Sequence, residues 1–99
     1  MTRFVRARGV VARRIAGEMV LVPVATRSEN PATRVADFFV LNETGEYLWG
    51  LLSSPRGDDE LARHLITEYE ITPEQAAADV RAFLDEMRAN GALDTDEVG

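Results

Sequence analysis

DFFVLNETGEYLWGLL, residues 37–52, contains two secondary-structure elements and the joint between them. Residues 38–41 are aromatic, β-branched or aliphatic, which favours a strand with little exposed side-chain surface. Asn42 follows at once, and its short side chain can accept a hydrogen bond from the N–H groups that open a helix. Glu43 and Glu46 then occupy the first turn, where the helix dipole favours negative charge. The stretch therefore predicts a strand that leads directly into a capped helix, whose apolar face carries Tyr47, Leu48, Leu51 and Leu52.

Two further strands are predicted on the N-terminal side of this joint, at 10–15 and 19–24. Ala16 and Gly17 between them form a credible tight turn, because glycine adopts positive φ without strain. Pro23 has no N–H group and belongs at the end or outer side of its strand. The polar segment 25–36 is predicted to be an exposed loop that leads to the third strand at 37–41.

Two more helices are predicted on the C-terminal side. After a turn at 53–58, Asp58 is a plausible N-cap for a helix that runs to about Glu70. Thr72 is placed to cap the third helix, with Pro73 at its first position and Gln75 in position for a capping box. Asn90 and Gly91 end this helix through a left-handed cap. Segregated strands and helices (βββααα) predict an α+β fold, a winged helix-turn-helix-like arrangement of a three-stranded antiparallel sheet followed by three helices.

The composition indicates one small domain. The chain has 99 residues, of which 10–93 are expected to form the domain, 1–9 a flexible basic N-terminus and 94–99 an acidic flexible tail. The absence of cysteine excludes disulfides, thiol nucleophiles and thiolate metal sites. No run of about 18 apolar residues and no apolar signal core occur, which predicts a soluble cytoplasmic protein.

The charge is distributed unevenly along the chain. Residues 1–34 carry seven arginines and two glutamates, whereas residues 35–99 carry four arginines and fifteen acidic residues. This predicts a basic sheet region on an acidic helical region, a difference that bears on the partners of the protein. Any single one of these charges is more often a solvated surface group than part of a site.

No set of residues suggests catalysis. The only histidine, His64, lies beside Leu65 in the second predicted helix and is best explained as a packing residue, because a metal site would need further ligands. Residues 58–60 lack the alternating ligands of a calcium loop and suit a helix N-terminus. Ser53 and Ser54 have no base nearby in sequence. We therefore expect no enzymatic activity, no catalytic residue, no bound metal and no cofactor.

Two functions that need no catalysis remain open at this point. The first is a winged-helix DNA-binding transcription regulator, which the predicted architecture also suits, but a reading helix must approach phosphates. The third helix carries Glu74, Asp79, Asp85 and Glu86 against Arg81 and Arg88, which favours a peptide over nucleic acid as the ligand. The second is a structural dimerisation module, in which an open strand edge pairs with itself to form a homodimer.

Two segments resemble a known family. They are VLNETGEYLWGLL at 40–52 and EYEITPEQAAADVRAFLDEM at 68–87, within a likeness that extends over 10–93. This pattern resembles the PqqD family, also called the RiPP recognition element, although the loop at 25–36 is longer than in a minimal member. The resemblance implies a non-catalytic peptide chaperone that binds the leader segment of a ribosomally made precursor peptide and presents it to a modifying enzyme, often a radical SAM protein. It also implies that the leader adds as a strand beside the third strand, in a cleft against the third helix.

The candidate peptide-binding residues follow from this geometry. An open strand edge is a template for another strand, and pockets for alternate side chains supply selectivity. The third strand contributes four candidates, of which Phe38 or Phe39 is expected to form a pocket wall. Arg81 and Arg88 are expected to meet acidic leader side chains at the rim. The full set is Phe38, Phe39, Val40, Leu41, Val80, Arg81, Phe83, Leu84, Met87 and Arg88. The apolar positions of the third helix suit a plain core equally well, and Trp49 suits either the rim of the core or a partner surface.

Overall fold

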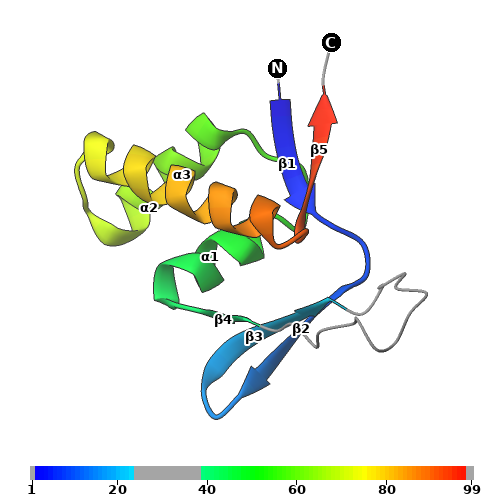
Figure 1. Cartoon of the computed structure of the whole chain (residues 1–99). Coiled ribbons are helices and arrows are strands. Elements are labelled where there is room, and N and C mark those ends of the chain that lie inside the picture. Colours follow the sequence, from blue (N-terminus) through cyan, green and yellow to red (C-terminus); the bar gives the residue numbers. More distant parts are fainter. Residues whose placement is uncertain (1, 24–38, 98–99) are drawn as a thin grey trace.

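The computed structural model describes residues 2–23 and 39–97 of the chain (Figure 1). The elements in chain order are β1 (Thr2–Arg6), β2 (Val10–Ile15), β3 (Glu18–Pro23), β4 (Phe39–Leu41), α1 (Glu43–Leu51), α2 (Asp58–Tyr69), α3 (Pro73–Ala89) and β5 (Leu93–Glu97). The predicted loop at 25–36 and the first two residues of the predicted third strand, Asp37 and Phe38, lie outside the described residues.

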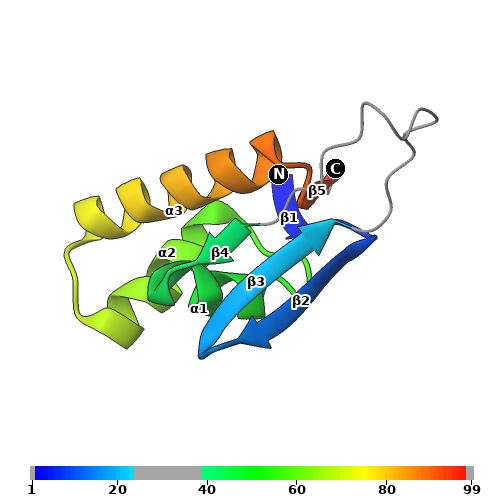
Figure 2. The same ribbon diagram turned by 60° about the horizontal axis from the view of Figure 1, so that its bottom comes forward.

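The predicted three-stranded antiparallel sheet is present, with the strand order β2-β3-β4. The turn between β2 and β3 has positive φ at both central residues, 52° at Ala16 and 84° at Gly17, which matches the right-handed twist of the hairpin. Val20 of β3 pairs with Val40 of β4. Figure 2 shows β4 with β3 on one side and α3 on the other, so that β4 lies at the edge of its sheet.

The joint between β4 and α1 forms as the sequence predicts. The Asn42 side-chain oxygen accepts a hydrogen bond from the Gly45 N–H at 2.7 Å, and the Glu46 N–H donates to the Asn42 carbonyl at 2.8 Å. A Cβ atom at Gly45 would come within 3.2 Å of the Asn42 Oδ1 atom, so glycine lets the capping side chain keep its position. The cap thus holds the start of α1 directly against the end of β4.

The ends of α2 and α3 agree with the predictions in part. Thr72 caps α3 by accepting a hydrogen bond from the Gln75 N–H at 3.1 Å, and Gly91 follows the helix with a φ of 71°. The Gln75 side chain donates to Asp79 at 2.7 Å instead of completing a capping box. The prediction of Asp58 as the cap of α2 is wrong, because Gly57 is the N-cap and Asp58 is the first helical residue.

A second sheet, which was not predicted, joins the two ends of the chain. β1 pairs antiparallel with β5 from Thr2↔Glu97 to Arg6↔Leu93. Phe4 anchors β1, since its side chain is buried and its backbone exchanges hydrogen bonds of 2.7 and 2.9 Å with Arg56. The segments 1–9 and 94–99 were expected to be flexible ends, whereas their described parts contribute to paired strands, which Figure 1 shows side by side as β1 and β5.

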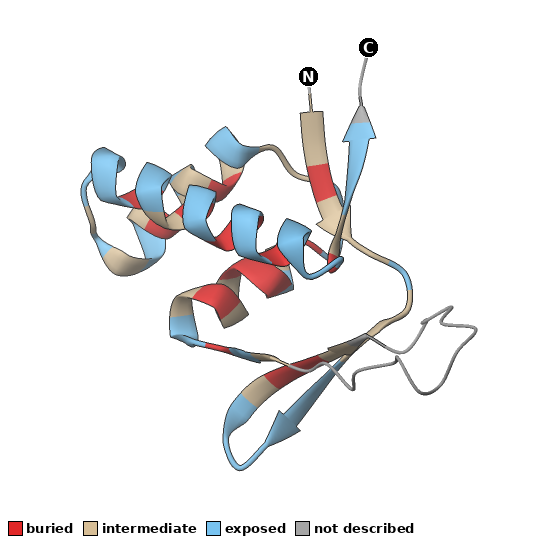
Figure 3. Ribbon diagram, viewed as in Figure 1, coloured by how far each residue is buried: buried red, intermediate tan, exposed pale blue. Residues whose placement is uncertain are grey.

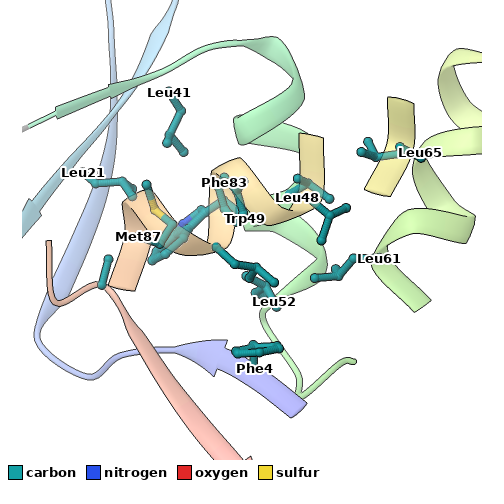
Figure 4. Packing of buried hydrophobic residues seen from close by; sticks show 14 residues of the cluster. Phe4, Leu21, Leu41, Leu48, Trp49, Leu52, Leu61, Leu65, Phe83 and Met87 are labelled. Carbon is teal, nitrogen blue, oxygen red and sulfur yellow. The ribbon is translucent and has the colours of Figure 1, made fainter. Parts of the chain in front are cut away.

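The core lies between the sheet and the helices, where the buried positions in Figure 3 face one another. Figure 4 shows this cluster, to which β3, β4, all three helices and β1 contribute. Trp49 is only 2% exposed and belongs to this core. The Arg6 guanidinium lies 4.9 Å from the centre of the Trp49 ring and donates to the Trp49 carbonyl at 2.9 Å, which ties β1 to α1.

Candidate functional site

The free edge of β4 is the starting point of the site. Among the described strands β4 pairs with β3 alone, so its other edge presents unpaired backbone groups. Side chains alternate along a strand, and here Leu41 is buried and Phe39 packs against the core, whereas Val40 remains 47% exposed. Phe38 or Phe39 was expected to form the pocket wall, but Phe39 faces the core and Phe38 lies outside the described residues. Val40 is the side chain available to a ligand.

A hollow of about 300 Å³, the β4–α3 cleft, lies beside this edge. It is lined on one side by Val40, Leu41, Asn42, Thr44 and Gly45, and on the other by Asp79, Ala82, Phe83 and Glu86 of α3. The four residues of α3 are spaced i, i+3, i+4, i+7, so they share one face of the helix. The cleft therefore combines an open strand edge, several apolar side chains and two carboxylates.

Several candidates predicted from the sequence do come together at this cleft. Val40, Leu41 and Phe83 all line it. Phe83 is 7% exposed, so most of its side chain packs in the core and only its margin reaches the cleft. Met87 is fully buried and takes its place in the core cluster.

The other α3 candidates face a different hollow, of about 250 Å³, between α3, α2 and β1. Val80 and Leu84 are almost fully buried and form part of its floor. Arg81 and Arg88 line it together with three aspartates, and the Arg88 guanidinium lies 5.6 Å from the centre of the Phe4 ring. The structure thus does not bring these two arginines to the β4–α3 cleft.

The polar residues that line the cleft were not among the candidates predicted from the sequence. Asn42 was assigned only to helix capping, and Asp79 and Glu86 only to the acidic surface of α3. Helical spacing from Phe83 could have found Asp79 and Glu86, which lie four residues before it and three after it. That step requires knowing which side of Phe83 faces β4.

A second hollow, the tyrosine hollow, begins on the other side of Asn42. It has a volume of about 640 Å³ and is lined by Leu41, Asn42, Glu18, Glu43, Glu46, Tyr47 and Tyr69, among others. The two tyrosine rings meet edge to face with centroids 5.7 Å apart. Burial, followed by the charge of Glu43, raises the pKa of Tyr69. Arg14 forms an ion pair with Glu46 at this margin.

The described residues show no sign of a metal site or of a membrane-spanning helix. Within 2–23 and 39–97, no group of three or more His, Asp or Glu side chains is arranged to hold a metal ion. The half-buried His64 lies on α2, and its carbonyl accepts a hydrogen bond of 3.5 Å from the Tyr47 hydroxyl. None of the helices in the described part of the chain has the length and apolar character needed to cross a membrane.

Two solved structures share this fold. "Lasso peptide synthetase B1 complexed with the leader peptide" has a TM-score of 0.70 and 21% identity, and the match covers 91% of this chain and 95% of that one. "TbiB1 in Complex with the TbiA(beta) Leader Peptide" has a TM-score of 0.72 and 23% identity, with 91% and 94% covered. A comparison with curated proteins gave no match.

The family comparison covers most of the domain. Residues 18–93, from the first residue of β3 to the first residue of β5, match the family described as Coenzyme PQQ synthesis protein D (PqqD). The match includes β3, β4, all three helices and every residue that lines the β4–α3 cleft. Because this match covers more than half of the chain, the chain belongs to the PqqD family.

Proposed function

We propose that this protein binds the leader segment of a ribosomally synthesised precursor peptide in the β4–α3 cleft and presents it to a modifying enzyme. The observation that carries the proposal is the free edge of β4 beside a cleft with an exposed Val40. Membership of the PqqD family supports it, as do the two similar structures, whose descriptions name leader peptides.

The physical basis of the binding is strand addition. A peptide strand beside β4 gains main-chain hydrogen bonds, each of which contributes a net value of about 1 kcal/mol. β4 has three residues, so it offers an edge of only about 10 Å. Such a short edge cannot supply high affinity alone, and peptide side chains that enter the apolar part of the cleft, between Val40 and Phe83, supply the rest.

The protein itself contributes positioning and no chemistry in this proposal. The modifying enzyme carries out the reaction, and a radical SAM protein is the class that we propose. The cytoplasm, where ribosomes make the peptide, is the compartment that the proposal requires. A homodimer through the β4 edge would compete with the leader, because both would use the same backbone groups.

The proposal is tested by an amide NMR titration of labelled full chain with the short peptides encoded beside its gene. We expect shifts at residues 39–41 and along 79–86, with residues 10–12 of β2, on the opposite edge of the same sheet, as an internal control. Repeating the titration at two protein concentrations separates peptide binding from self-association. Shifts confined to the arginines of β2, obtained with duplex DNA and with none of the peptides, would overturn the proposal in favour of a transcription regulator.

A further inference from the structure

The charge of the cleft has one sign. Asp79 and Glu86 are the charged side chains that line it, and both are acidic. The two basic residues of α3, Arg81 and Arg88, line the hollow on the other side of the helix. In the described part of the chain the ion pairs are Arg14–Glu46 and Arg56–Glu60, so neither carboxylate of the cleft has a basic partner there. The only hydrogen bond to the Asp79 side chain comes from the neutral Gln75, again among the described residues.

We infer that the β4–α3 cleft selects a basic peptide, in which one apolar residue is flanked by lysine or arginine. The inference rests on the proposed function and adds the chemical class of the leader. The apolar residue lies between Val40 and Phe83, and the basic residues meet Asp79 and Glu86. This is the opposite of the acidic leader that the sequence analysis expected for Arg81 and Arg88.

The spacing of the carboxylates predicts a sequence pattern. Along the axis of α3, Asp79 precedes Phe83 by about 6 Å and Glu86 follows it by about 4.5 Å, at 1.5 Å per residue. In an extended peptide, residues two apart point to the same face and lie about 6.7 Å apart. β4 and these α3 side chains line the same cleft, so a strand added to the free edge of β4 runs beside them. The pattern is therefore basic-x-apolar-x-basic.

The surface that continues from the cleft has the same sign. Leu41 and Asn42 line both the cleft and the tyrosine hollow. Glu43 and Glu18 add further carboxylates in the tyrosine hollow. Arg14 forms its ion pair there with Glu46 and leaves the charges of the other two without a basic partner among the described residues. A peptide that extends past the end of β4 thus moves from one acidic hollow to the next, and the field of both steers basic peptides towards the edge.

The experiment is a selection from a random twelve-residue peptide library by mRNA display, with the full chain as bait. Enriched sequences are synthesised with a fluorescent label and measured by anisotropy and by amide NMR. The test variant is Asp79→Lys/Glu86→Lys. The matched control is Glu74→Lys/Asp85→Lys, which makes the same change of net charge at exposed positions of α3 outside the cleft lining. Circular dichroism confirms that both variants fold.

The expected result is enrichment of the basic-x-apolar-x-basic pattern, with shifts at the amides of β4. The test variant should bind these peptides about tenfold more weakly, since two exposed ion pairs are lost, and the control should bind them as before. A selection on the test variant should then enrich Asp and Glu at the two flanking positions.

Two other results have distinct meanings. If the enriched peptides shift the β4 amides but are neutral or acidic, or if the test variant binds them unchanged, the inference is overturned and the proposed function stands. If the library yields no binder, or binders that leave the β4 amides unshifted, the proposed function fails and the inference fails with it.

Discussion

Replacing Val40 with serine is expected to weaken peptide binding about fivefold in a protein that stays folded. Full burial of a valine side chain contributes about 1.5–3 kcal/mol. Val40 is still 47% exposed in the free protein, so a docked peptide that covers the remainder gains about 1 kcal/mol, which corresponds to a roughly fivefold change in Kd. Serine keeps the strand geometry and loses most of this apolar contact.

The chain offers a matched control for this substitution. Ile15 is 57% exposed and lies on β2, the opposite edge strand of the same sheet. Ile15→Ser and Val40→Ser are each expected to change the free energy of unfolding by about 1 kcal/mol or less, which urea denaturation measures.

The binding assay is fluorescence anisotropy with a labelled peptide that shifts the β4 amides. Of the two substitutions, only Val40→Ser is expected to raise the Kd of this peptide. An equal loss of affinity in both variants, or an unchanged affinity in folded Val40→Ser, would refute the assignment of the cleft.

Three further predictions concern the elements around the site. Asn42→Ala should lower the free energy of unfolding by about 1 kcal/mol in urea denaturation, because the Gly45 N–H loses its acceptor. Asn42→Asp should keep most of the stability that the cap contributes. Equal midpoints for wild type and Asn42→Ala would contradict the capping role. Ala16→Gly should raise the thermal midpoint and stabilise the protein by about 1 kcal/mol, since φ is 52° there; a lower midpoint would contradict this argument. The pKa of Tyr69 is raised above 10.0, so the folded state holds the tyrosine proton to a higher pH than the unfolded state. The stability that this group contributes is therefore present below pH 10 and is lost as the pH rises through the folded pKa. Ultraviolet titration of Tyr47→Phe should show the Tyr69 midpoint above that of free tyrosine, and a midpoint at or below it would contradict the shift.

Local sequence signals predicted the elements next to the site well. The caps at Asn42 and Thr72 and the turn at Ala16–Gly17 each depend on residues within a few positions of one another, and all three form. The cap of α2 was displaced by one residue, because Asp58 and its neighbours are all acidic and each suits the first turn.

Features that depend on distant residues were not predictable in the same way. β1 and β5 are charged, show no clear alternation, and become a sheet only by pairing across the length of the chain. The site depends on which side chains of β4 face the core. Alternation along a strand leaves open whether Phe39 or Val40 does so, and a one-residue shift exchanges the two faces. The same uncertainty on α3 led to the choice of Arg81 and Arg88 over Asp79 and Glu86.

The pairing of β1 with β5 has a consequence for protein engineering. Thr2 lies opposite Glu97, and Figure 1 shows the β1–β5 sheet on the side of the molecule away from β4. A short linker can therefore close the backbone into a ring, which is the condition for circular permutation. By the same geometry the domain can be spliced as a cassette into a surface loop of a host protein, with both junctions on one side and the binding edge facing outward.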